Sequence, residues 1–288
     1  MEIPRWYASI LDKEFKQLRL VVVSDAHVGN PLFSEKHFKR TLDFIADNAD
    51  VFCILNGDLV EAITKTSKGI LFDQKITPQE QRDYVIELLK PIKEKILGAT
   101  WGNHERRIYN EVGLDVMQDI VKALATKKYP LGLPYRAEGM IHKIKFGHGN
   151  EGHPDKSYVF WGYCTHGYGG ARTKSGKAVK VERVATWVNC DFYAMSHDHV
   201  VNVAPDDYLD HDDRETIDKE TNFVTGKVVS HRKMLIKTNA YLKWGGYSEM
   251  GGFPPVDLAT PVIFLLTPES DYWNLVPERP QKAVKVIV

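Results

Sequence analysis

Five short motifs place metal-binding residue types directly after apolar, strand-like segments of this 288-residue chain. The clearest is the sequence Gly-Asn-His-Glu at positions 102–105, which follows the apolar run 96–101. Because ligands of open α/β sheets bind at the carboxyl ends of strands, polar clusters in these positions predict a common site. The other four clusters are Asp25 with His27, Asn56 with Asp58, His166 before a glycine, and His197 with His199.

Two of the motifs carry ligand-type residues two positions apart. Side chains at positions i and i+2 of an extended segment point to the same side, so Asp25 and His27 could chelate one ion. The same holds for His197 and His199. Imidazole nitrogens together with carboxylate and amide oxygens suit first-row divalent ions, and no thiolate belongs to the set. We therefore expect manganese first, with iron, zinc or nickel as alternatives.

The combination of motifs resembles the signature of the calcineurin-like metallophosphoesterase superfamily, over residues 21–200. The resemblance implies an α/β fold, an αββα sandwich of two mixed β-sheets flanked by helices, and a site for two divalent metal ions. The segment 241–255 is similar to the carboxyl-terminal part of uncharacterised phage and bacterial members and could form a cleft rim. The implied ligands are Asp25, His27 and His199 for one ion, Asn103, His166 and His197 for the other, and Asp58 as the bridge.

The chemistry of such a site follows from its charge. Two divalent ions outweigh two aspartates, so the site would attract a phosphate group and polarise its oxygens. A metal-bound water would become a hydroxide nucleophile near neutral pH. The resemblance implies that His104 acts as the general acid. Glu61, three residues after Asp58, is expected to orient His104, and a solvated surface carboxylate is the alternative for Glu61.

A second histidine competes for one ligand position. His148 also precedes a glycine near the end of a predicted strand, so it is an alternative to His166. We favour His166 because it follows the longer strand and one predicted helix separates it from His197. The remaining histidines are expected near the site, for His148 and His153, or in solvent, for His37, His142, His211 and His231.

Basic residues beside the motifs are candidates for substrate binding. Arg106 directly follows the motif at 102–105, and Arg172 and Lys174 belong to a glycine-rich segment after His166. A solvated connection into the next helix is the alternative for that segment. The lysine-bearing segment 61–76 could fold over the site, and its role stays open.

The elements that must position these residues can be read from the apolar pattern. Helices are expected after Ser34, after a capping box at 77–80, at 114–124 and at 177–189. The segment 206–220 holds eight acidic and two basic residues, which indicates a solvated hairpin tip or loop. Strands are expected at 18–24, 51–55, 96–101, 140–146, 158–165, 192–196, 234–239, 262–266 and 283–288.

Composition limits the remaining possibilities. With 43% hydrophobic residues the chain can bury a substantial core, and we expect one domain over 1–288, with a motif-bearing part at 18–204 and closing strands at 221–288. The 38 acidic residues balance the 38 basic ones, so charge alone does not indicate a nucleic-acid binder. Cys53, Cys164 and Cys190 lie in apolar surroundings, as expected of buried thiols in a reducing compartment. No signal peptide or membrane span is expected, and the default location is cytoplasmic.

These observations predict a hydrolase of phosphoesters. We expect a phosphodiesterase acting on nucleic acid, a cyclic nucleotide or a nucleotide derivative. The alternatives are a phosphomonoesterase for a small molecule or a protein and, third, a non-catalytic scaffold. Ala62 stands where protein phosphatases carry an arginine, and His104 stands where lipid-A-pathway hydrolases carry one. The sequence leaves the natural substrate and the oligomeric state open.

Overall fold

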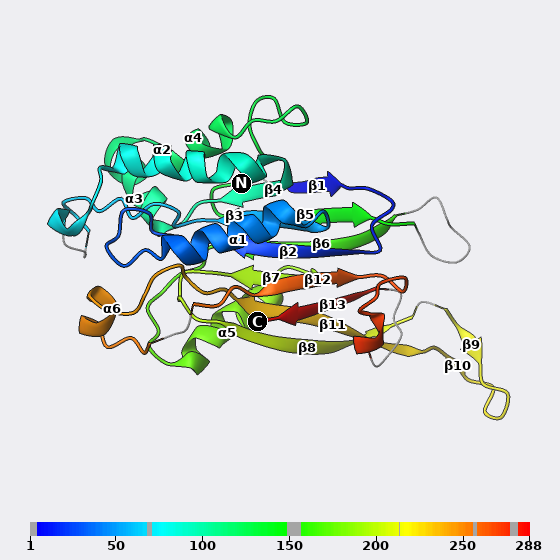
Figure 1. The fold of residues 1–288 in the computed structure, drawn as a ribbon. Helices are drawn as coiled ribbons and strands as arrows, with labels where there is room; N and C mark the ends of the chain where they lie inside the picture. The colour runs from blue at the N-terminus through cyan, green and yellow to red at the C-terminus, as the bar shows by residue number, and fades with distance from the viewer. Residues whose placement is uncertain (1–4, 68–70, 149–156, 213, 256–257, 277–281) are drawn as a thin grey trace.

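Two β-sheets packed face to face, with helices on both outer sides, form the body of the molecule (Figure 1). The structure is a computed structural model and describes residues 5–67, 71–148, 157–212, 214–255, 258–276 and 282–288. The architecture is the predicted αββα sandwich of two mixed sheets. Among the residues with a predicted role, His153 lies outside the described residues, as do parts of the longer predicted segments.

The two large sheets interleave distant parts of the chain. β12 (Val262–Leu266) pairs antiparallel with β2 (Gln17–Val23). A predicted closing strand therefore lies beside the strand that precedes the first motif. The five-stranded sheet has the order β13 (Ala283–Ile287), β12 (Val262–Leu266), β2 (Gln17–Val23), β3 (Val51–Asn56), β4 (Ile96–Thr100). The six-stranded sheet has the order β1 (Trp6–Ile10), β5 (Gly139–Phe146), β6 (Tyr158–Thr165), β7 (Phe192–Met195), β11 (Val228–Lys237), β8 (Asn202–His211).

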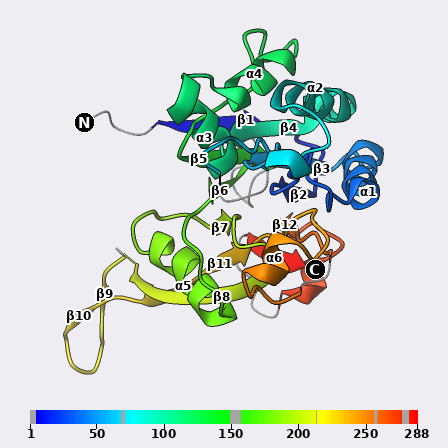
Figure 2. The same cartoon turned by 90° about the vertical axis from the view of Figure 1, so that its left-hand side faces the viewer.

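Helices cover both outer faces. The five-stranded sheet carries α1 (Glu35–Asp47), α2 (Pro78–Leu89), α3 (Asn103–Val112) and α4 (Val116–Ala123). The six-stranded sheet carries α5 (Lys174–Ala185), and the short α6 (Tyr247–Met250) lies at the same end of the molecule as α5 (Figure 2). Three short 3₁₀ helices lie at Leu71–Asp73, Lys90–Lys95 and Trp273–Leu275.

Alternation along the strands explains the layers. In β2, Leu18, Leu20 and Val22 pack into the apolar core between the sheets, whereas Val21 and Val23 pack beneath the helices. Successive side chains of a strand point to opposite faces, so a strand buried on both faces reads as a continuous apolar run. A third core lies between α5 and the six-stranded sheet. The described helices include none long and apolar enough to cross a membrane.

Several local predictions are confirmed. The capping box before α2 is present, because the Thr77 hydroxyl accepts from the Glu80 amide and the Glu80 carboxylate accepts from the Thr77 amide. The helix stops at Leu89, ahead of Pro91. Cys53, Cys164 and Cys190 are free and buried, and burial raises the pKa of each thiol to about 12.

Other local predictions were wrong. The helix expected at 114–124 is present as α4, but the separate helix α3 before it was missed, and Gly113 ends α3 with a left-handed φ of 72°. α5 begins at Lys174 rather than at 177 and ends earlier than expected. The edge strand β1 was missed. His142, expected in solvent, is fully buried and its Nε2 lies 2.9 Å from the Ser9 hydroxyl.

The acidic segment is a hairpin, one of the two forms expected for it. β8 and β11 extend beyond the sandwich, and the small strands β9 (Thr216–Ile217) and β10 (Val224–Thr225) pair at the tip of this arm. Figure 1 shows the arm at the end of the molecule opposite to α3 and α6. Charged side chains on an edge strand disfavour pairing with another chain.

One buried side chain ties the two sheets together at the α3 end. Asn56, the last residue of β3, donates from Nδ2 to the Thr165 carbonyl (2.8 Å) and to the Ser196 hydroxyl (2.6 Å). Its Oδ1 accepts from the Thr100 hydroxyl (2.8 Å). Thr165 and Ser196 belong to the other sheet, so these bonds fix the separation of the two layers at this end.

We predict that Asn56→Ala lowers the free energy of unfolding by about 2 to 4 kcal/mol, because buried partners lose their hydrogen bonds without access to water. Urea denaturation measures the change. Asn110→Ala, at an exposed position of α3, is the matched control and should stay within about 0.5 kcal/mol. Equal effects of the two substitutions would contradict the role of Asn56.

Candidate metal centre

The five motifs meet at one end of the sandwich, the end at which α3 begins. Asp25, Asp58 and Asn103 follow β2, β3 and β4 of one sheet, and His166 and His197 follow β6 and β7 of the other. Their ligand-type atoms form three groups in which all atoms lie within 4.8 Å of one another. The groups are Asp25, His27 and His199; Asp58, His166 and His197; and His27, Asp58 and His104.

The backbone of these motifs is left-handed, not extended. Asp25 and His27 have φ of 50°, and His197 and His199 have φ of 71° and 51°. The expectation that i and i+2 side chains converge because the segment is extended was therefore wrong in its reason. Asp25 and His27 do lie in one donor group, whereas His197 and His199 lie in different groups. Left-handed conformations cost about 1 to 3 kcal/mol per non-glycine residue and persist where the surroundings impose them.

Hydrogen bonds between the turns impose these conformations. The Asp25 amide donates to the Gly57 carbonyl and the His27 amide to the Asp58 carbonyl, each at 3.0 Å. Two glycines allow the neighbouring turn to come close. A Cβ on Gly57 would lie 2.2 Å from the Gly102 nitrogen, and a Cβ on Gly102 would lie 2.1 Å from Oδ1 of Asp58.

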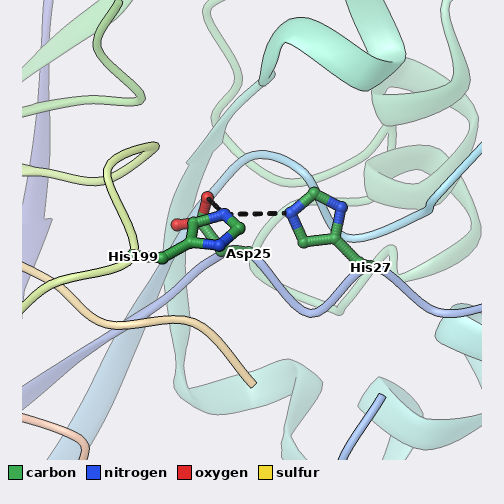
Figure 3. A group of neighbouring side chains, drawn as sticks. All are labelled: Asp25, His27 and His199. Atoms are coloured by element: carbon green, nitrogen blue, oxygen red, sulfur yellow. Dashed lines mark hydrogen bonds and ion pairs between the residues drawn. The ribbon is translucent and has the colours of Figure 1, made fainter. Parts of the chain in front are cut away.

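The first group contains three donor atoms aimed at one point (Figure 3). His199 Nε2 lies 3.1 Å from Asp25 Oδ1 and 3.2 Å from His27 Nε2. Two imidazole nitrogens at this distance, beside a carboxylate oxygen, are arranged to share a cation. Asp25 Oδ1 is buried and accepts no hydrogen bond of normal geometry from the described residues, so it has an unused lone pair.

The second group is built around His166. Its Nε2 lies 3.0 Å from Asp58 Oδ2 and 3.2 Å from Asn103 Oδ1. Its Nδ1 lies 2.8 Å from the Asn56 carbonyl, which can only accept, so Nδ1 carries a proton and Nε2 is the nitrogen that can bind a metal once it is deprotonated. His197 Nε2 in the same way donates a hydrogen bond to the Gly169 carbonyl (2.6 Å), which leaves Nδ1 as the nitrogen whose lone pair can bind a metal.

Asp58 lies between the groups. Its Oδ2 is 3.0 Å from His166 Nε2 in one group and 3.9 Å from His27 Nε2 in the other. The predicted bridging role of Asp58 requires such a position, and the role stays a prediction. His104 Nε2 also lies 3.9 Å from the same oxygen.

The expected role of the Glu61 carboxylate differs from its contacts. Glu61 is buried and is not a solvated surface carboxylate, but its Oε2 lies 2.9 Å from His27 Nδ1 and not beside His104. The backbone carbonyl of Glu61, not the carboxylate, accepts from His104 Nδ1. Glu61 therefore orients His27 with its side chain and His104 with its main chain. This contact joins residues 34 positions apart in the chain, so the sequence alone does not reveal it.

Glu105 is a buried carboxylate to which the sequence analysis gave no role. It accepts hydrogen bonds from the amides of Asp58 (2.9 Å), Leu59 (2.8 Å) and Gly102 (2.8 Å). These bonds join the turn after β3 to the start of α3. The capping-box spacing of Gly102 and Glu105 is the signal that could have revealed this residue.

The electrostatics of the centre favour a bound cation. Burial opposes ionisation of Asp25, but His166 and His199 hold its pKa at about 2. Burial likewise opposes protonation of the histidines, yet Glu61 and the aspartates raise the pKa of His27 to about 9, and Asp58 and Asp25 raise that of His166 to about 10. The ionised carboxylates thus stabilise positive charge at the centre, and protons on the histidines provide that charge when no metal is bound. The donor set and the unused Asp25 oxygen fit divalent metal ions.

No hydrogen bond or ion pair among the described residues connects the predicted substrate-binding residues to these groups. Arg106 and Lys174 are exposed, and Arg172 lies over the Phe253 ring at 5.9 Å. Phe253 belongs to the expected rim segment 241–255, which starts at the centre because the Tyr241 amide donates to the Asp25 carbonyl (3.0 Å). His148 is exposed beside Glu14 and is not among the donor groups. The substrate-binding roles stay predictions.

Comparison with known proteins finds similar solved structures of low sequence identity. No family model and no curated protein sequence matches the chain. Similar solved structures include a protein of Streptococcus pneumoniae TIGR4 described as a predicted phosphoesterase, at 11% identity and a TM-score of 0.35, covering 86% of this chain and 83% of that chain. Vacuolar protein sorting 29 from Cryptosporidium parvum has 12% identity and a TM-score of 0.39, covering 94% and 97%. A single-mutant Vps29 from Entamoeba histolytica has 10% identity and a TM-score of 0.39, covering 94% and 98%.

We predict that metal binding releases protons. His27 and His166 are protonated at neutral pH in the metal-free protein, so a metal must displace about two protons, and affinity should rise about tenfold per pH unit for each proton released. Titration calorimetry with Mn²⁺ in buffers of different ionisation enthalpy, between about pH 6 and about pH 8, counts the protons. A flat affinity without proton release would contradict the arrangement.

The same shifts predict the pH dependence of the metal-free fold. Both histidine pKa values lie above the ordinary value of 6.5, so their stabilising interactions are complete below about that pH. The stabilisation is lost as the pH rises through about 9 and about 10.

Proposed function

We propose that this protein is a dinuclear metal-dependent phosphoesterase that hydrolyses a phosphodiester, such as a nucleic acid, a cyclic nucleotide or a nucleotide derivative. The observation that carries the proposal is the position of Asp58, whose Oδ2 lies between two donor groups and 3.9 Å from the imidazole of His104. In this proposal the first ion is held by Asp25, His27 and His199, the second by Asn103, His166 and His197, and Asp58 bridges them. Manganese is the expected metal.

Bound divalent ions would supply Lewis acidity, a lowered pKa of water and a positive template for phosphate. The chain's own residues prepare the site for them. The Asn56 and Gly169 carbonyls fix the tautomers of His166 and His197, and Glu61 fixes His27, so the free lone pairs point inward. Glu105 holds the backbone beneath Asp58.

His104 is the proposed general acid. Its Nδ1 proton is donated to the Glu61 carbonyl, so Nε2 is the atom that faces Asp58 and the centre. Burial lowers the pKa of His104 to about 4 in the metal-free protein. An anionic substrate beside Nε2 would favour the protonated ring, which could then give its proton to the leaving-group oxygen.

A phosphomonoesterase is the alternative, and a scaffold is the third reading. The scaffold reading is weakened by the complete set of donors, since a surface that only binds protein has no need for seven buried or half-buried ligand-type groups around one point. A cytoplasmic location and the exposed cations Arg106, Arg172 and Lys174 as substrate contacts remain part of the proposal.

We predict that the manganese-loaded protein hydrolyses bis(p-nitrophenyl) phosphate faster than p-nitrophenyl phosphate, and that Asp58→Asn abolishes both reactions by removing the bridging charge. Release of p-nitrophenol measures the rates. A preference for the monoester would move the assignment to the phosphomonoesterase. No hydrolysis of either substrate by protein with two bound ions would count against the proposed chemistry.

We further predict that His104→Ala lowers kcat about 10² to 10⁴-fold while metal binding is kept, because a general acid acts on the leaving group and not on the ions. His148→Ala, at an exposed histidine outside the donor groups, is the control and should leave kcat unchanged. The loss should be smaller for substrates whose leaving group needs no proton. An equal loss for all leaving groups would contradict the acid role.

A further inference from the structure

The turn that carries His197 and His199 is anchored by a buried cluster of charges. Asp198 lies between the two histidines, and its side chain contacts lysines rather than the metal centre. Lys180 Nζ lies 2.6 Å from Asp198 Oδ1, and Lys237 Nζ lies 2.7 Å from Oδ2. Lys177 Nζ donates to the Asp198 carbonyl at 2.9 Å.

The three lysines come from two elements that pack together. Lys177 and Lys180 are three residues apart on α5 and so share a helix face, and Lys237 is the last residue of β11, opposite Met195 of β7. Lys237 is fully buried and also donates to the Ser196 carbonyl (2.7 Å). Lysine is rarely buried unless it is paired, so a buried cluster of this kind indicates a specific task.

The task follows from the position of the turn. His199 belongs to the donor group of Asp25 and His27, whereas His197 belongs to the group of Asp58 and His166. Both histidines are in left-handed conformations, and the Asp198 amide bonds to the Ser196 carbonyl (2.8 Å), which keeps the turn tight. A tilt of this single turn would displace one ligand from each donor group at the same time.

We propose that Asp198, Lys180 and Lys237 are positioning residues that set the placement of both metal positions relative to each other. The proposal rests on the dinuclear site of the proposed function. In this proposal the lysines strengthen metal binding by positioning the ligands, although their positive charge by itself weakens it. Two ammonium groups contact the Asp198 carboxylate and a third contacts the Asp198 carbonyl, so the excess positive charge by itself repels a cation.

This opposition gives the test a sign. Replacing one lysine by methionine removes a positive charge near the centre, so charge alone predicts tighter metal binding. Loss of positioning predicts weaker binding, by about 10 to 100-fold as for other residues that orient metal ligands. The two explanations thus predict opposite changes in the same quantity.

The experiment is a calorimetric titration of the metal-free, full-length protein with Mn²⁺, for the wild type, Lys180→Met and Lys237→Met. Circular dichroism verifies that each variant is folded. Lys233→Met is the matched control, because Lys233 lies on β11 but contacts the Ala185 carbonyl and not Asp198. We expect both test variants to bind both ions about 10 to 100-fold more weakly, and the control to be unchanged.

A conservative variant separates positioning from general destabilisation. Lys180→Arg keeps the ion pair with Asp198 and should restore most of the metal affinity that Lys180→Met loses. If Lys237→Met does not fold, Lys180→Met decides, because the Lys180 side chain keeps 11% of its surface exposed, whereas that of Lys237 is fully buried. Unchanged or tighter metal binding in a folded test variant would overturn the proposal.

Hydrolysis of bis(p-nitrophenyl) phosphate by the same samples separates this inference from the proposed function. A wild type that binds two ions but hydrolyses no phosphoester would count against the proposed function, while weaker metal binding by the variants would still support the positioning role. An active wild type with variants of normal metal affinity would overturn the positioning role alone.

Discussion

The candidate centre depends on how the two sheets are held at one end, because two of the three donor groups combine residues from both. Beside the contact between the Ser24 and Thr238 hydroxyls (3.1 Å), Asn56 makes such a connection. Its side chain bonds to Thr165 and Ser196 of the opposite sheet, and its carbonyl accepts from the His166 ring. The residue that sets the separation of the layers therefore also fixes a ligand tautomer. Packing of apolar faces alone would allow the layers to slide, whereas directional hydrogen bonds do not.

Around this connection, the chain accepts unfavourable backbone conformations for the sake of the side chains. Five of the ligand-type residues have positive φ, among them Asp58 at 51°. The Glu105 carboxylate and the bonds between the turns after β2 and β3 hold these conformations. Strained residues that cluster at one site, and are fixed by their neighbours, are typical of functional sites. Most of the described non-glycine residues with positive φ thus belong to the centre and not to the rest of the fold.

The sequence predicted the layers and most strands because a strand buried on both faces leaves a continuous apolar run. It also predicted that these ligand-type residues meet at one end of the sandwich, because their types and order form a specific combination, and their roles as ligands stay predictions. It could not predict what depends on backbone turns. The partner of Glu61 and the burial of His142 were missed, since each follows from a contact between segments distant in the sequence. α3 was missed because its first residues are polar and belong to the site.

The composition of the donor groups has a consequence for the molecule as a whole. Asp25 and His27 come from one sheet and His199 from the other, and the second group is divided in the same way. Ions bound here would act as cross-links between the layers and would not merely stiffen a loop. Ligand binding to the native state alone stabilises it in proportion to RT ln(1 + [L]/Kd). Metal binding would therefore stabilise the packing of the two sheets against each other, so resistance to proteolysis would depend on the concentration of metal.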